Sequence, residues 1–128
     1  MGRVKEETLA EKLLYEYRIL LWRKKLTKEG LPPDLEDLMV FAEGLVELLK
    51  GSGRNGARMY EVIRLTYLTE TEATIEDILK DLSTADGKPM HIGSYYRIKS
   101  QALSALNKAL ETQQSLAAKT KHISSYIG

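Results

Sequence analysis

Hydrophobic residues recur along most of this chain at spacings of three and four positions. Such spacing places apolar side chains on one face of an α-helix, and the chain has no stretch of strict apolar–polar alternation of the kind that a strand needs. The pattern therefore predicts an all-α protein. Two breaks interrupt it. Gly30 to Pro33 must end a helix, because proline lacks an N–H and forces extended backbone at the residue before it. Gly51 to Gly56 predicts a connector, because it holds three glycines in six residues.

These breaks divide the chain into an N-terminal two-helix hairpin (1–50), a Gly-rich connector (51–56), a three-helix unit (57–110) and a C-terminal tail (111–128). The second helix, over about 34–50, begins with Asp34, Glu36 and Asp37, whose charges suit a helix N-terminus better than acid–base catalysis. The predicted core stripe of this helix consists of Leu35, Leu38, Met39, Ala42, Leu45, Val46 and Leu49.

The first helix, over about 4–29, has two apolar stripes on different faces. The first consists of Leu9, Leu13, Leu14, Tyr17, Leu20 and Leu21, and the second, here called the outer stripe, of Tyr15, Ile19, Trp22 and Leu26. Two stripes imply contacts on two sides of the helix. The outer stripe therefore has two interpretations: the helix is sandwiched within its own bundle, or the stripe is a homodimer interface that gives residues 1–50 a role in dimerisation.

Three helices are expected after the connector, over about 58–68, 74–82 and 91–110. The middle helix opens at Thr74 with an acid three residues on, close to a capping box. Ser83 to Met90 predicts a turn-rich loop, because it includes Asp86, Gly87 and Pro89. Two short helices, a turn and a longer helix form the layout of a helix-turn-helix unit.

The net charge of +1 argues against nucleic acid as the partner until the charge is resolved by segment. Residues 1–50 carry net −1 and residues 51–82 net −2, whereas residues 83–128 hold six basic and two acidic residues, net +4. No acid occurs between Gly87 and Ala109. A local positive stripe on a near-neutral protein fits duplex DNA binding, because only the docking face must meet phosphates.

The last helix has a core face and an outward face without carboxylates. The core face is expected to hold Ile92, Tyr95, Ala102, Leu103, Leu106, Ala109 and Leu110, and the outward face Gly93, Ser94, Arg97, Ser100, Gln101, Ser104 and Lys108. An ordinary solvated face mixes Glu with Lys, whereas this one offers groups that bond to base edges. The candidates for base contacts are Ser94, Arg97, Ser100 and Gln101. The candidates for phosphate contacts are Lys88, Tyr96, Lys99 and Lys108, with the stem of Lys99 expected along the core. His91 reads as a residue of the helix start rather than a ligand.

Three segments together resemble region 4 of bacterial sigma factors: Glu61 to Leu68, Thr74 to Leu82, and Tyr96 to Leu106. The run Ser94-Tyr95-Tyr96-Arg97 and the later Ala102-Leu103-x-x-Leu106 are more similar still to ArpU-type transcriptional regulators of phages. The resemblance covers about residues 57–110, and the loop over 83–90 is longer than the family's turn. It implies a phage or prophage DNA-binding regulator in a bacterial host's cytoplasm, with RNA polymerase as a further candidate partner.

Other classes are less well supported by the residues. The chain has no cysteine, which excludes disulfides and Cys-based zinc sites, and its two histidines are too few for a structural metal. The connector lacks the Lys-Ser/Thr end of a phosphate-binding loop, so neither an enzyme nor a cofactor is expected. The longest apolar run, Leu38 to Ala42, is far too short to span a membrane. We therefore expect a non-enzymatic DNA-binding regulator, with a helical protein-interaction adaptor of phage assembly or packaging as the alternative.

Overall fold

The computed structural model describes the backbone of residues 8–70, 73–86 and 90–127, with side chains for 8–70, 73–83 and 90–112. Its elements are α1 (Leu9–Leu26), α2 (Pro33–Glu47), the 3-10 helix η1 (Leu48–Gly51), α3 (Gly56–Tyr67), α4 (Ile75–Asp86) and α5 (Ile92–Ile127). No strand occurs in the described ranges, so the prediction of an all-α protein is confirmed.

The ends of α1 and α2 follow from local chemistry. At the start of α1, the Thr8 hydroxyl oxygen accepts a hydrogen bond from the Glu11 N–H, as an N-cap residue does. Gly30, at φ +80°, turns the chain before α2. Pro33 then opens α2 at a position where its missing N–H costs nothing. One of the carboxylates expected there, Glu36, forms an ion pair with Lys24, whose Nζ lies 3.1 Å from the Glu36 Oε2.

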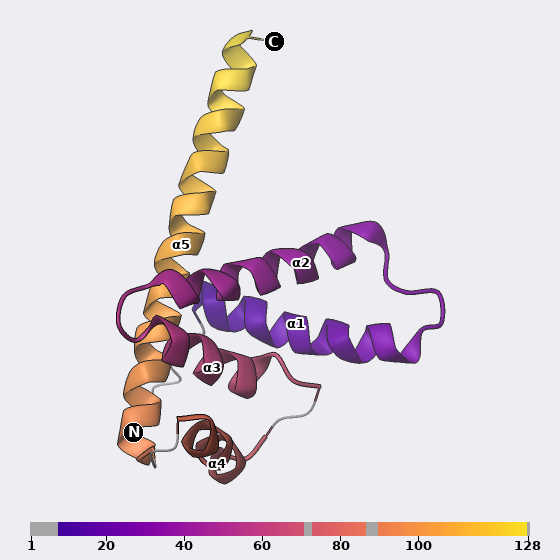
Figure 1. The fold of residues 1–128 in the computed structure, drawn as a ribbon. Coiled ribbons are helices and arrows are strands. Elements are labelled where there is room, and N and C mark those ends of the chain that lie inside the picture. Colours follow the sequence, from indigo (N-terminus) through magenta and orange to yellow (C-terminus); the bar gives the residue numbers. More distant parts are fainter. Residues whose placement is uncertain (1–7, 71–72, 87–89, 128) are drawn as a thin grey trace, which may run out of the picture.

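Helices α1 and α2 lie side by side and run in opposite directions, with α3 beside them (Figure 1). Helix α5 crosses the first three helices, and its C-terminal half projects beyond them. We expected this helix to end near Leu110, but it continues to Ile127. Helix α4 also continues past the expected end at Leu82, as far as Asp86. The connection between α4 and α5 is therefore shorter than the predicted loop over 83–90.

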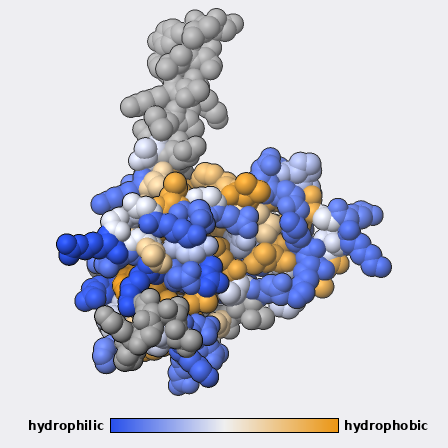
Figure 2. Space-filling model, viewed as in Figure 1, coloured by the Kyte–Doolittle hydropathy of each residue, from blue (hydrophilic) through white to orange (hydrophobic). Residues whose placement is uncertain are grey.

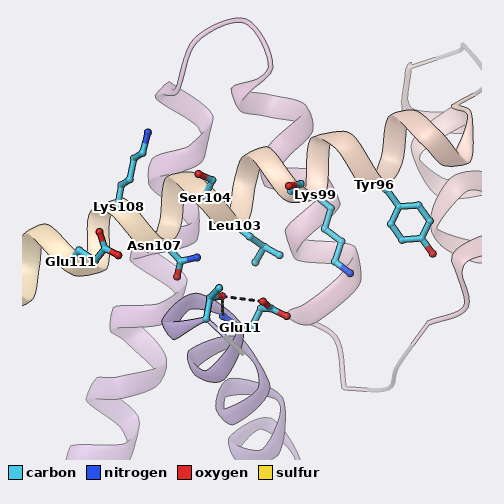
Figure 3. Close-up of a pocket in the computed structure, with 10 residues that line it drawn as sticks. Glu11, Tyr96, Lys99, Leu103, Ser104, Asn107, Lys108 and Glu111 are labelled. Atoms are coloured by element: carbon cyan, nitrogen blue, oxygen red, sulfur yellow. Dashed lines mark hydrogen bonds between the residues drawn. The ribbon is translucent and has the colours of Figure 1, made fainter. Parts of the chain in front are cut away.

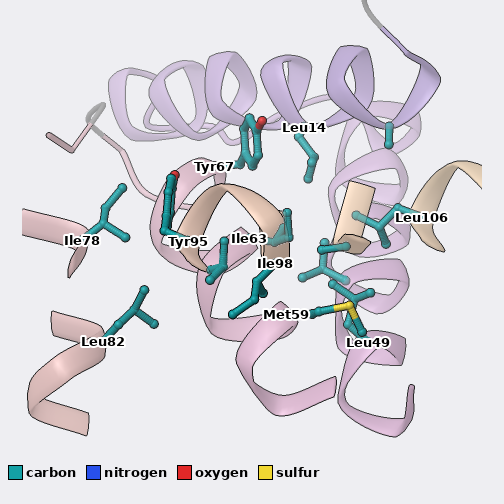
Figure 4. Close-up of a cluster of buried hydrophobic side chains, with 14 of the residues drawn as sticks. Leu14, Leu49, Met59, Ile63, Tyr67, Ile78, Leu82, Tyr95, Ile98 and Leu106 are labelled. Carbon is teal, nitrogen blue, oxygen red and sulfur yellow. The ribbon is translucent and has the colours of Figure 1, made fainter. Parts of the chain in front are cut away.

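One buried hydrophobic cluster joins all five helices (Figure 4). Leu14 of α1 and Val46 of α2 share this core with Ile63 of α3, Leu82 of α4 and Leu106 of α5. A second cluster between α1 and α2 consists of Tyr17, Leu20, Met39 and Ala42. The helices before and after the Gly-rich connector are thus packed around a common core.

The Gly-rich connector is shorter than predicted, because both of its ends belong to helical elements. Gly51 ends η1, and Gly56 is the buried first residue of α3. A Cβ on Gly56 would lie 2.5 Å from the carbonyl oxygen of Leu49 and 2.7 Å from that of Lys50. Glycine at position 56 therefore lets α3 begin directly against η1.

The two stripes of α1 have different surroundings. Leu14, Tyr17 and Leu20 of the first stripe are buried, although Leu9 at its start is 41% exposed. The outer stripe remains largely in solvent, with exposed fractions between 40% for Tyr15 and 75% for Leu26. Helix α1 contacts α2, α3 and α5, and the Tyr15 ring meets that of Tyr67 edge-on at 5.7 Å, but the described part of the chain does not cover the rest of the outer stripe as the sandwich interpretation expected.

Candidate nucleic-acid interface

The first half of α5 is held in place by its packing on α3 and α4. Tyr95, Ile98 and Ala102 are 2%, 3% and 0% exposed, so this face of the helix belongs to the core. The Tyr95 hydroxyl forms a 2.8 Å hydrogen bond with the hydroxyl of Thr66 on α3. This bond gives the buried phenol a polar partner among apolar neighbours. The pKa of Tyr95 is raised, because burial raises it by more than the hydrogen bond with Thr66 lowers it. The phenol is thus a neutral anchor that fixes the rotation of α5.

With this rotation, most of the predicted base-contact residues face solvent. Arg97, Ser100 and Gln101 are exposed, whereas Ser94 is half-buried. Arg97 and Gln101 are four residues apart, so they lie one above the other on the same side of the helix. The structure brings these two longest base-contact candidates together on one exposed surface.

The burial of two isoleucines of α5 is the reverse of what the sequence predicts. Ile92, which we expected in the core, is 52% exposed, and Ile98, absent from the expected core face, is 3% exposed. The prediction for Ile92 is wrong because it is the first residue of α5, where nothing covers its side chain among the described residues. Ile92 lies one turn before Tyr95 and Tyr96, so its exposed side chain is at the start of α5 and not on the face of Arg97 and Gln101.

Tyr96 and Lys99, two of the phosphate-contact candidates, form a small group at the edge of this face. Tyr96 is 46% exposed, and its ring meets that of Tyr95 edge-on with centroids 5.2 Å apart. The Lys99 Nζ lies 5.6 Å from the ring centroid of Tyr67 and 5.9 Å from that of Tyr96, within the range of cation–π contacts. The half-buried lysine thus covers apolar surface with its stem and keeps its ammonium at the edge.

Lys108, the third phosphate-contact candidate, lies farther along α5. It is exposed, and 11 residues separate it from Arg97, which corresponds to about 16 Å along the helix axis. Figure 3 shows Lys99 extending toward α1, whereas Lys108 extends the other way. Lys88, the fourth candidate, lies outside the described residues. Of the four phosphate-contact candidates, the structure therefore places Tyr96 and Lys99 close together and Lys108 at a distance from them.

A polar groove of about 550 Å³ runs between α5 and the N-terminus of α1 (Figure 3). Asn107 is central to it, since its Oδ1 accepts a 2.8 Å hydrogen bond from the Ala10 N–H. Lys99 and Lys108 line the groove together with Glu11 and Glu111. These carboxylates make the groove less favourable for phosphate than we expected from the outward face of α5, which has no carboxylate of its own. The charge of Glu11 could not be placed beside α5 from the sequence, because the two segments are nearly 100 residues apart.

The surface of α4 also carries negative charge. Glu76 and Asp77 lie exposed in its first turn, and Asp81 is exposed one turn later. In helix-turn-helix proteins, the helix before the recognition helix crosses the DNA backbone. Acids at that place would repel phosphates, so the exposed surface of α4 does not favour contact with DNA.

Within the part of the chain that the structure describes, no group of three or more His, Asp or Glu residues could hold a metal ion. Over the same residues, no helix combines the length and the apolar character needed to cross a membrane. No protein-family model, curated protein or solved structure matches the chain.

Proposed function

We propose that this protein is a sequence-specific, duplex DNA-binding transcriptional regulator that reads the major groove with the first turns of α5. The observation that carries the proposal is the exposed face of Arg97, Ser100 and Gln101 on a helix without a carboxylate between Gly87 and Ala109. The resemblance of residues 57–110 to sigma region 4 and to ArpU-type phage regulators supports the same class.

The side chains of this face have chemistry suited to base edges. Arginine bonds to the O6 and N7 acceptors of guanine, and glutamine bonds to N6 and N7 of adenine. Ser100, on the same face, can donate to or accept from several bases.

Few phosphates are expected to be contacted, because the described cations on or beside this face are few. Arg97, Lys99 and Lys108 are the described basic residues on or beside the face, and Glu11 and Glu111 line the same groove as Lys99 and Lys108. Each neutralised phosphate contributes about −0.9 to the slope of log affinity against log salt. Two to three contacts per chain therefore predict a slope of about −2 to −3.

The test is a salt titration of duplex binding, followed by fluorescence anisotropy, with the wild type and three variants. Arg97→Ala should relax the sequence preference more than Lys108→Ala, because a base contact specifies and a phosphate contact only positions. Lys28→Ala removes the same charge from the exposed link between α1 and α2, and should leave binding unchanged. Absence of duplex binding at low salt would refute the proposal.

The alternative, a helical adaptor that binds another protein and no DNA, is favoured by exposed apolar side chains outside α5. On the face seen in Figure 2, apolar patches lie over α1 and α2 between charged side chains. Phe41 of α2 and Leu48 of η1 are two such exposed apolar side chains, at 39% and 66%. A protein that ignores duplex DNA at low salt but keeps its fold would support the adaptor.

A further inference from the structure

We infer that the outer stripe of α1 binds the outer stripe of a second copy of this chain, with the two α1 helices antiparallel. The inference is independent of DNA binding. Its starting point is that Ile19, Trp22 and Leu26 are 59%, 47% and 75% exposed on a helix whose opposite face is buried. Side chains of this size in one row are costly to leave in water.

The spacing of the stripe is self-complementary. Its members follow one another at intervals of four, three and four residues, so the pattern reads the same in both directions. A two-fold axis midway between Ile19 and Trp22 therefore brings Ile19 of one copy against Trp22 of the other. The same axis brings Tyr15 against Leu26. An antiparallel pair thus buries every member of the stripe against another member, as an isologous interface requires.

The charges that flank the stripe favour the antiparallel direction. Glu16 and Arg23 border the same side of it, about 7 Å before and about 4 Å after the two-fold axis along the helix. In an antiparallel pair, Arg23 of the second copy lies opposite Glu16, with the two positions about 3 Å apart as measured along the helix axis. The two-fold symmetry makes this contact twice. Among the described residues, no ion pair occupies either side chain within its own chain.

A parallel pair would instead place like charges opposite one another. In parallel helices, a residue on one flank faces the residue five positions later on the other flank. Glu11 would then face Glu16, which is a repulsive pair. This pair disfavours the parallel arrangement.

The remaining flank carries two cations that their own chain already binds. Arg18 donates hydrogen bonds to the carbonyl oxygens of Thr66 and Thr69. Lys25 makes a 2.6 Å ion pair with Glu70. The antiparallel pair places Arg18 opposite Lys25 of the second copy, a like-charge pair, and the bonds within each chain draw these cations toward its own body.

A groove next to the stripe can accept the largest side chain of the partner. It measures about 300 Å³ and lies between α1 and α2, with Leu20, Leu35 and Leu38 in its apolar wall. Ile19, which opposes Trp22 of the second copy, also lines it, as do Glu16 and Arg23. The indole of the second copy can bury its apolar body there and keep its N–H near the Glu16 carboxylate.

The first test measures association without DNA. Sedimentation equilibrium over about 1 to 100 µM should show a monomer–dimer equilibrium, because an interface of about two helices is at the small end of specific interfaces. Trp22→Ser should raise the dissociation constant at least tenfold, since a central aromatic is typically a hot spot. Val40→Ser, which removes a 65% exposed side chain from α2, should not. A monomer throughout the range, or a dimer insensitive to Trp22→Ser, would overturn the inference and leave the stripe to a different protein.

The second test measures direction by disulfide formation, which is clean because the chain has no native cysteine. A mixture of Tyr15→Cys and Leu26→Cys proteins should form a cross-linked heterodimer. Either protein alone should not, because two copies of position 15 are about 16 Å apart along an antiparallel pair. Cross-linking of each variant with itself would indicate a parallel pair and contradict the inference. Val40→Cys is the control for random collision.

Exchange of the flanking charges tests the same geometry without cysteine. Glu16→Lys and Arg23→Glu should each weaken the dimer severalfold, and the double variant should restore it because the pair is re-formed with reversed sign. Two weakened single variants without restoration would contradict the pairing. Loss of duplex binding with an intact dimer refutes only the proposed function, and a monomer that binds duplex DNA refutes only this inference.

Discussion

Replacement of Gly56 by alanine should destabilise the protein, although alanine is the better helix former. A Cβ at this position would lie 2.5 Å and 2.7 Å from the backbone carbonyl oxygens of Leu49 and Lys50. Ordinary contacts between carbon and a carbonyl oxygen begin near about 3.3 Å, so η1 and α3 would have to separate by nearly 1 Å. Backbone atoms cannot rotate away as a flexible side chain can.

The expected size of the effect follows from two opposing contributions. Overpacking of a close-packed site costs about 1–3 kcal/mol, and contact with backbone places Gly56 toward the upper part of that range. Better helix propensity offsets less than about 1 kcal/mol, because Gly56 is the first residue of α3. We expect a net loss of about 2 kcal/mol, and a chain of 128 residues would show it as a melting temperature lower by about 7 °C.

Gly44→Ala is the matched control. Gly44 lies in the last turn of α2, is exposed, and has no atom within 4 Å of an added Cβ. The same substitution should therefore stabilise the protein by about 0.5–1 kcal/mol. Thermal and urea unfolding, followed by circular dichroism at 222 nm, measure both variants. Equal or greater stability of Gly56→Ala alongside a stabilised Gly44→Ala would refute the close packing of η1 against α3.

Three further predictions concern the rest of the molecule. Ile98→Ala should cost about 2–4 kcal/mol in urea unfolding, whereas Ile92→Ala should change stability by less than about 0.5 kcal/mol; similar losses would contradict their different burial. Asn107→Ala should cost about 1 kcal/mol because the Ala10 N–H loses its acceptor, and Asn107→Asp, which keeps an acceptor, should lose less; equal losses would assign the effect to packing instead. Burial, the hydrogen bond with Glu43 and the charge of that carboxylate raise the pKa of Tyr17 above 10.0, and burial raises that of Tyr67. Stability should therefore be complete below pH 10 and fall as the pH rises further, less so in Tyr17→Phe; absorbance at 295 nm that shows these phenols ionising before unfolding would contradict the prediction.

The order of the helices follows from the sequence because each buried face repeats at helical spacing. Val62 and Ile63 in α3, and Ile78 and Leu82 in α4, are buried as that spacing requires. The far end of α5 was not predicted, because the apolar pattern fades after Leu110 while the backbone stays helical to Ile127.

Features that depend on distant segments could not be predicted from local pattern. Gly56 reads as part of a flexible connector until η1 brings the Leu49 carbonyl against it. One acid that limits the candidate interface reaches it from another element, since Glu11 of α1 lines the groove beside Lys99 and Lys108. The exposed side chains of α5 were largely predicted, since Arg97 and Gln101 share a helical face, but their electrostatic surroundings depend on tertiary packing.

The measurement that tests the central claim most directly is selection of binding sites from a pool of random duplexes, with the wild type and Arg97→Ala compared at the same salt concentration. The proposed function predicts that the wild type enriches a common sequence and that Arg97→Ala loses preference at one or two positions, with guanine the expected base at the contact. Enrichment of no sequence by the folded wild type, or an identical sequence enriched by Arg97→Ala, would contradict the assignment of α5 as the recognition helix.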